Sequence, residues 1–207
     1  MEMSSGRKTI DELFNHISNG DAEEKEYLYN WVAHAFQEPR RKSQHLILQG
    51  TQGTGKSIFA NTFLPLLFKL KKNAYLSLTT NYPMRDCFGK FNDKLENVGL
   101  LVLDEVTNRE YKKYRRHIIG MLLDSHLVIN HRYGSMDYLP NYLRLVSTTN
   151  EMKLDFDFEN KEWCYKVATI KEKMPEELAK KVMDLTVVDY AYFYQEMMER
   201  QAHEMVV

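Results

Sequence analysis

The sequence predicts an α/β fold in which a parallel sheet is flanked by helices. Short apolar runs alternate with segments of helical periodicity along the chain. Two of these runs, at 45–49 and 100–103, are predominantly apolar, which is typical of strands in a parallel sheet covered on both faces. Strands that alternate with helices indicate crossover connections and hence a parallel sheet.

Helical periodicity extends from residue 9 to residue 36, with a break at Asn19-Gly20. Pro39 and the basic residues after it end this pattern, and the first strand follows. Four strands of the sheet are expected, at 45–49, 75–78, 100–103 and 143–147.

The connections between the strands contain two helices and a hairpin. The helix after the first strand contains Pro65, which should kink or shorten it, and the helix after the third strand is expected at 115–123. The runs 127–129 and 136–139 lie on either side of a turn and predict a β-hairpin insertion. Pro175 begins a further helical segment.

At 207 residues the chain can form one main domain with small extensions. Its hydrophobic fraction of 43% and charged fraction of 28% are those of an ordinary soluble globular protein. The pattern divides it into a helical amino-terminal segment at 1–43, a core at 44–168 and a helical carboxyl-terminal segment at 169–207.

The composition also disfavours several classes of protein. No apolar run approaches the ~20 residues that a membrane span requires, and residues 1–20 lack the features of a secretory signal. We therefore expect a cytoplasmic protein without membrane contact. Cys87 and Cys164 have no metal-ligand neighbours, which argues against a zinc site. Because the net charge is −1, nucleic-acid contact would require a local basic patch.

A glycine-rich sequence lies between the first expected strand and the helix after it. It satisfies the pattern G-x-x-x-x-G-K-[ST] of a phosphate-binding P-loop, and its residues are Gly50, Thr51, Gln52, Gly53, Thr54, Gly55, Lys56 and Ser57. The glycines let successive backbone N–H groups point at phosphate oxygens, and the helix presents its positive end to the same charge. Lys56 is expected to reach the β and γ phosphates of ATP, and the Ser57 hydroxyl to coordinate Mg²⁺.

The third expected strand ends in Asp104 and Glu105. Ligands of open α/β sheets bind at the carboxyl ends of the strands, so both carboxylates are expected beside the P-loop. Asp104 would hold the magnesium ion, and Glu105 would polarise the water that attacks the γ-phosphate. An apolar run followed by two acids is common in proteins. We assign a function to this one because a P-loop precedes it in the sequence.

The fourth expected strand has a polar end, Ser147-Thr148-Thr149-Asn150, at the same edge of the sheet. Asn150 could bond the γ-phosphate or the attacking water. The alternative interpretation is a polar strand end followed by a turn, in which asparagine is favoured. The P-loop, the acids and this strand together predict a P-loop NTPase core.

Two local clusters are candidates for contact with nucleic acid. Residues 109–117 are rich in basic side chains with two interleaved tyrosines, although such a run is more often a solvated helix face. His131, Arg132 and Tyr133 lie at the tip of the expected hairpin. A projecting cation and aromatic can grip a single strand by charge and stacking, so we prefer the hairpin.

From about residue 27 to residue 167 the chain resembles the helicase domain of superfamily 3 helicases, of the primase-helicase type found in phages, plasmids and mobile elements. The resemblance is carried by residues 27–34, Pro39, the P-loop, 103–106, the hairpin, 140–145 and 147–151. It implies a P-loop NTPase core of the AAA+-like type, in an ATP-driven motor that assembles as a ring, usually a hexamer, and moves along single-stranded DNA in replication. It also implies that Asn150 senses the γ-phosphate and that Arg132 faces the central channel.

The chain departs from the pattern of that family in two places. Such proteins usually carry an Asp-Arg-Arg-aromatic run that supplies an arginine finger to the neighbouring subunit, and here residues 160–163 read Asn-Lys-Glu-Trp. Lys161 offers charge without a planar fork, so we expect a weak substitute. A further family lysine is replaced within Ile118-Ile119. No primase region is recognised, so a separate primase is an expected partner.

Three functions follow from these patterns. The first is a helicase-type ATPase that hydrolyses ATP between subunits and holds DNA with Arg132 and its neighbours. The second is a nucleotide-dependent switch or assembly protein that binds ATP and partners but hydrolyses slowly, which the missing arginines favour. A small-molecule kinase is disfavoured, because no arginine-rich lid follows the fourth strand and Glu105 suits water activation better than phosphate acceptance.

Overall fold

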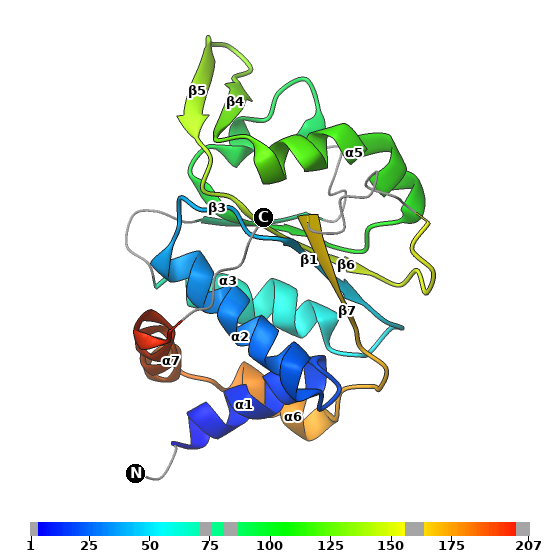
Figure 1. Ribbon diagram of the computed structural model, residues 1–207, viewed down its shortest axis with the longest axis vertical. Coiled ribbons are helices and arrows are strands. Elements are labelled where there is room, and N and C mark those ends of the chain that lie inside the picture. Colours follow the sequence, from blue (N-terminus) through cyan, green and yellow to red (C-terminus); the bar gives the residue numbers. More distant parts are fainter. Residues whose placement is uncertain (1–3, 71–75, 81–86, 156–163, 202–207) are drawn as a thin grey trace.

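A five-stranded parallel sheet lies at the centre of the computed structural model, which describes residues 4–70, 76–80, 87–155 and 164–201 (Figure 1). The strand order is β2-β3-β6-β1-β7. The strands are β1 (His45–Gln49), β2 (Leu76–Thr80), β3 (Val98–Leu103), β6 (Arg144–Thr149) and β7 (Tyr165–Thr169). The predicted α/β fold with a parallel sheet is confirmed.

Strand β6 enters the sheet between β1 and β3, although it follows both in the sequence. In the parallel register Gln49 of β1 lies opposite Thr149, and Leu103 of β3 lies opposite Ser147. The carboxyl ends of the three strands therefore meet at one edge of the sheet. The segments that follow β1 and β3 leave this edge on either side of the end of β6.

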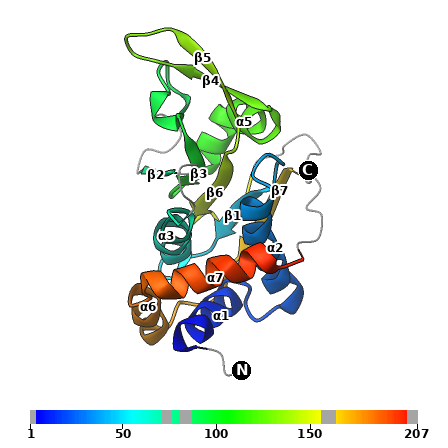
Figure 2. The same cartoon turned by 90° about the vertical axis from the view of Figure 1, so that its left-hand side faces the viewer.

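Successive residues of each strand point to opposite faces of the sheet, and each face carries its own apolar core. On β1, Leu46 and Leu48 belong to one core and Ile47 to the other. The first core is covered by α1 (Ser5–Ile17), α2 (Ala22–Gln37), η1 (Ile58–Phe63), α3 (Leu64–Phe68), α6 (Glu176–Met183) and α7 (Val187–Glu199). The second contains α5 (Asn108–Leu123), η2 (Asp93–Leu95) and the hairpin of β4 (His126–Asn130) and β5 (Met136–Pro140). Figure 2 shows α5 and the hairpin on the side away from the helical layer.

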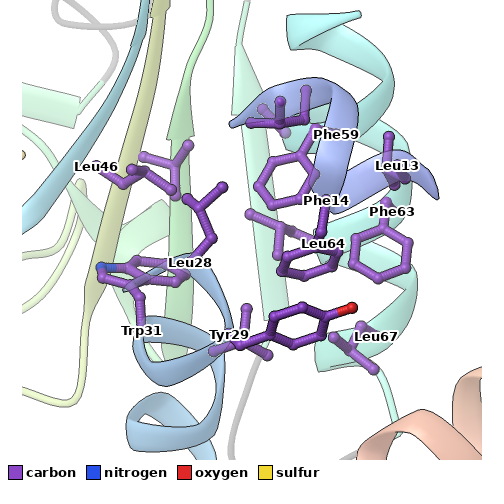
Figure 3. Close-up of a cluster of buried hydrophobic side chains, with 14 of the residues drawn as sticks. Leu13, Phe14, Leu28, Tyr29, Trp31, Leu46, Phe59, Phe63, Leu64 and Leu67 are labelled. Carbon is purple, nitrogen blue, oxygen red and sulfur yellow. The ribbon is translucent and has the colours of Figure 1, made fainter. Parts of the chain in front are cut away.

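The first core joins the two ends of the chain to the centre. Phe14 of α1 stacks on Tyr29 of α2 with ring centroids 4.3 Å apart, and it lies edge-on to Phe59 and Phe63 at 5.4 and 5.7 Å (Figure 3). Phe193 of α7 is 5.6 Å from the same ring. The division at residues 43 and 168 stays a prediction, and apolar contacts cross both points.

The predicted helices and hairpin are largely present. The break at Asn19-Gly20 separates α1 from α2, and both residues have positive φ, 54° and 74°. The expected start of the helix at residue 115 was wrong, because α5 begins at Asn108. Thr107 and Glu110 form a reciprocal capping box that fixes this earlier start. No helix among the described residues is long and apolar enough to cross a membrane.

Two further differences concern the first helix and the sheet. The segment after the P-loop is a π-helix at Ile58–Phe63, and an α-helix begins at Leu64 with Pro65 in its first turn. Pro65 was expected to kink or shorten the helix, and in the structure the π-helical winding changes to α-helical winding just before this proline. Strand β7 was not expected, because the edge sequence Tyr165–Thr169 contains a lysine and lacks a long apolar run.

Truncation of Phe14 should destabilise the whole protein. Phe14 is fully buried among aromatic rings from three other elements, α2, η1 and α7, so Phe14→Ala leaves a cavity that should cost about 3–5 kcal/mol of unfolding free energy. Urea denaturation followed by circular dichroism measures the loss. Exposed Lys8→Ala on the same helix should change the free energy by less than about 0.5 kcal/mol, and an equal loss in both variants would contradict the assignment.

Candidate nucleotide-binding site

The P-loop is the turn between β1 and η1, and its shape depends on contacts with β6 and β7. The Gly50 N–H donates to the Thr149 carbonyl at 3.2 Å. A side chain at Gly50 would place its Cβ 2.6 Å from the Ile170 carbonyl oxygen, so this position requires glycine for space. Gly53 has φ 85°, which requires glycine for conformation.

Lys56 is buried at the base of this turn, with 7% of its surface exposed. Its Nζ donates to the carbonyls of Gly50 and Thr51 at 2.6 and 2.7 Å. Burial lowers the pKa of Lys56, and the nearby Asp104 and Glu105 carboxylates act in the opposite direction. The ammonium group is thus held inside the loop that would receive a phosphate.

The two acids leave β3 at the edge predicted for them. The Thr148 hydroxyl donates to Asp104 Oδ1 at 2.6 Å and accepts from the Glu105 N–H at 2.8 Å. Asp104 is half-buried, whereas Glu105 is exposed and has a left-handed backbone with φ 55°. Such a conformation is uncommon for a non-glycine residue and is held here by the bond to Thr148.

Thr148 is a site residue that the sequence did not single out from the polar run 147–150. Its position in β6, between the P-loop strand and the acidic strand, lets one hydroxyl orient both Asp104 and the backbone of Glu105. The polar end of an otherwise apolar strand was the available signal. Its meaning depends on strand order, which the local sequence does not contain.

Residues from these three strand ends line one cavity of about 380 Å³. Glu105, Thr148 and the exposed side chain of Asn150 face the P-loop across it, and the first turns of η1 and α6 complete the wall. The lining residues are Gln52, Gly53, Thr54, Gly55, Lys56, Ser57, Ile58, Glu105, Thr148, Asn150, Met174, Glu176 and Ala179. The structure therefore brings together most of the residues predicted to bind phosphate.

Both helical extensions also touch the P-loop. The His16 Nε2 of α1 is 3.1 Å from the Thr54 carbonyl, which can only accept, so this ring nitrogen is the donor. The Met174 N–H, just before α6, donates to the Gly53 carbonyl at 2.9 Å. A larger cavity of about 570 Å³ lies between α1 and α6, and His16 lines it. His16 therefore lines this cavity and also contacts the P-loop backbone.

Metal binding at this site would need ligands from outside the protein. Within the described ranges, no three His, Cys, Asp or Glu side chains are grouped to hold a metal ion. Asp104 and the exposed Ser57 hydroxyl could supply two oxygen ligands. Mg²⁺ commonly takes one or two protein oxygens and completes its coordination shell with phosphate and water. These two oxygens therefore suit Mg²⁺ better than a metal ion that takes all of its ligands from protein side chains.

The remaining predicted site residues lie elsewhere. His131, Arg132 and Tyr133 form the exposed tip of the β4–β5 hairpin and do not line the P-loop cavity. His131 Nε2 is 2.9 Å from Asp137 Oδ2, and Tyr133 is 95% exposed. Lys161 lies outside the described residues.

A buried polar network lies under the site. His45 of β1 places its Nε2 2.9 Å from the Ser147 hydroxyl of β6, and the Tyr111 hydroxyl of α5 bonds to the same oxygen. Both rings are fully buried. The network ties α5 to the strand whose next residue, Thr148, orients the acids.

The chain thus has an α/β core in which a parallel sheet is flanked by helices, with a P-loop sequence motif after β1 and two acids after β3. The chain belongs to the DUF5906 family, a family of unknown function, which matches residues 48–162. That match includes the P-loop from Gly50, both acids, the hairpin and Lys161.

Solved structures of the NrS-1 C-terminal region have a similar fold. One apo structure has a TM-score of 0.75 and 19% identity, over 98% of this chain and 47% of that chain. The A form apo structure has a TM-score of 0.74 and 20% identity over the same shares. This chain therefore spans about half the length of the solved structures it matches. No curated protein matches it.

His45 should make stability depend on pH. Burial lowers the pKa of His45 from 6.5 to about 3. Between these values the unfolded chain binds a proton that the folded protein does not, so the free energy of unfolding should rise with pH and level off above 6.5. His34 acts in the same direction, because burial, Arg144 and Arg41 lower its pKa to about 4.

Urea denaturation at pH values from 4 to 6.5 measures this slope. His45→Gln should reduce it, because one of the two sites is lost, whereas exposed His126→Gln should leave it unchanged. Equal slopes in the parent and His45→Gln would show that His45 does not contribute.

Proposed function

We propose that this chain is an ATP-hydrolysing motor domain of helicase type that acts on single-stranded DNA in the replication of a phage or mobile element. The main support is the shared cavity, in which the P-loop faces Glu105 and Asn150 while Thr148 holds Asp104 beside them. The resemblance of residues 27–167 to superfamily 3 helicases supplies the direction of the proposal, since the fold alone is compatible with many activities.

In this proposal the P-loop binds the phosphates of ATP. Residues 52–58 line the cavity, so their backbone N–H groups could bind phosphate, and Lys56 would exchange the carbonyls of Gly50 and Thr51 for phosphate oxygens. Asp104 and Ser57 would hold Mg²⁺, which would supply positive charge to balance that of the phosphates. The cost of burying the Lys56 ammonium group is then offset by full opposite charges instead of carbonyl dipoles.

Glu105 is the proposed general base. Its side chain is exposed and lines the cavity, and the bond from its N–H to Thr148 fixes the backbone from which the carboxylate reaches that cavity. Asn150 is proposed to bond the γ-phosphate or the attacking water from the end of β6. A carboxylate and an amide on adjacent strand ends can together orient one water molecule.

Assembly and DNA contact complete the proposal. In a homo-oligomeric ring, such as a hexamer, Lys161 of one subunit would reach the ATP of the next. Arg132, together with His131 and Tyr133, would contact DNA in the central channel. A separate primase is a proposed partner.

A second candidate is a nucleotide-dependent switch that binds ATP and partners but hydrolyses slowly. The observation in its favour is the Asn-Lys-Glu-Trp sequence at 160–163, where the arginine finger is expected. A finger arginine is worth about 10³ to 10⁵ in rate, and lysine lacks its bidentate fork.

Steady-state ATPase rates, with and without single-stranded DNA, distinguish the two candidates. For the motor, DNA should stimulate turnover, and Lys56→Ala and Glu105→Gln should each reduce it at least about 100-fold. Thr148→Val keeps the shape of the side chain but frees Asp104, so it should reduce turnover about 10- to 100-fold. Thr9→Val, which removes a buried hydroxyl in α1, is the matched control and should retain turnover.

The motor and the switch predict different results in this assay. Tight ATP binding with turnover no higher than that of Glu105→Gln would favour the switch. Full activity in Lys56→Ala would contradict both candidates.

Arg132→Ala should weaken DNA binding. Arg132 lies at the exposed hairpin tip beside Tyr133, so its loss should remove about one phosphate contact and reduce the slope of log affinity against log salt by roughly 0.7. Fluorescence anisotropy with a labelled oligothymidylate measures both quantities. Equal binding by Arg132→Ala and the parent would remove the hairpin tip from the DNA site.

A further inference from the structure

Helix α5 presents a row of cations to solvent. Its exposed basic side chains are Arg109, Lys112, Lys113, Arg116 and His117, which we call the α5 cationic face. Their spacing of i, i+3, i+4, i+7 and i+8 puts them on one side of the helix. The opposite side carries Tyr111, Ile118, Met121 and Leu122 into the core.

This arrangement destabilises the isolated helix. Arg109 and Lys113 are four residues apart, as are Lys112 and Arg116, so like charges repel along the face. Arg109 also lies in the first turn, next to the positive end of the helix dipole. Glu110, the acid of the first turn, is engaged with Thr107 in the capping box.

Little within the described chain neutralises these charges. Lys112 pairs with Asp155 at 2.5 Å, and both side chains are largely exposed. Within the described ranges, no ion pair involves Arg109, Lys113 or Arg116. In a protein with a net charge of −1, this row is a local concentration of positive charge that can attract an anionic partner.

The face continues into a groove that Phe88 lines together with polar, acidic and basic residues. Arg116 and His117 line a cavity of about 380 Å³ between α5, residues 87–92 and the base of the hairpin. The Phe88 ring lies 5.4 Å from Tyr114 and 5.2 Å from His117. The Asn92 side chain fixes this wall to β4 by donating to the Val128 carbonyl and accepting from the Asn130 N–H. Figure 1 shows α5 directly beneath the hairpin.

We infer that the α5 cationic face binds the backbone of a single-stranded nucleic acid, as a contact surface additional to the hairpin tip. At a rise of about 1.5 Å per residue, Arg109, Lys113 and Arg116 are separated by about 6 and 4.5 Å along the helix axis, so they form a row along which a phosphate backbone can lie. The half-buried rings of Phe88 and Tyr114, and Tyr138 of the hairpin at 69% exposure, offer stacking surfaces for bases. An acidic protein segment would match the charge but not use these rings.

The choice of a single-stranded nucleic acid as the bound polymer rests on the proposed function, whereas the location of the binding surface does not. The test is binding of a labelled oligothymidylate without nucleotide, by the triple variant Arg109→Gln, Lys113→Gln and Arg116→Gln. Three lost phosphate contacts should reduce the salt slope by about 2 and the affinity at low salt at least about tenfold. The control, Lys8→Gln, Lys69→Gln and Lys180→Gln, loses the same charge from exposed positions in the helical layer and should bind like the parent.

A second variant separates charge from folding. Arg109→Lys, Lys113→Arg and Arg116→Lys keeps all three charges and should retain the salt slope. Equal slopes in the neutralised variant and the parent would overturn the inference, even if DNA-stimulated ATPase activity supports the motor. Loss of the slope without any ATPase activity would support the α5 site and contradict the motor. Displacement of the oligonucleotide by polyglutamate at equal charge concentration would indicate an acidic protein partner and would also overturn the inference.

Discussion

The parallel pairing of β6 with both β1 and β3 is the constraint on which the site depends. This pairing brings the Thr149 carbonyl to the Gly50 N–H on one side and the Thr148 hydroxyl to Asp104 on the other. The P-loop and the acids follow β1 and β3, which lie on either side of β6, so the axes of these two strands are about 10 Å apart. The strand order therefore sets the distance across which the two parts of the proposed phosphate site face each other.

The helices at both ends of the chain also help to position the site. The His16 ring and the Met174 N–H both bond to the P-loop backbone, and α1 and α6 pack into the same apolar core. Apolar packing at a distance from the site therefore holds the polar contacts of the P-loop in place. This arrangement explains why residues far apart in the sequence behave as one structural unit.

The sequence predicted the parts of the site that are encoded locally. The glycine spacing of the P-loop and the acids after β3 can be recognised without knowledge of the neighbouring strands. The contributions of Thr148 and His16 could not, because a threonine at a strand end and a histidine on a helix acquire their roles from contacts over long sequence separations. Strand β7 was missed for the same reason, since pairing with β1 stabilises a sequence of weak local preference. The start of α5 was different, because its capping box is a local signal that was overlooked.

The π-helical winding after the P-loop affects how relatives of this chain should be aligned. In η1 the Leu64 N–H bonds to the Phe59 carbonyl, five residues back, so each turn accommodates more chain than an α-helical turn. A homologue shorter by one residue could keep the same helix axis by adopting ordinary α-helical winding. The gap in such an alignment belongs inside the helix between Ile58 and Phe63, and moving it into a loop would shift the apparent equivalents of Phe63 and Leu67 by about 100° around the axis.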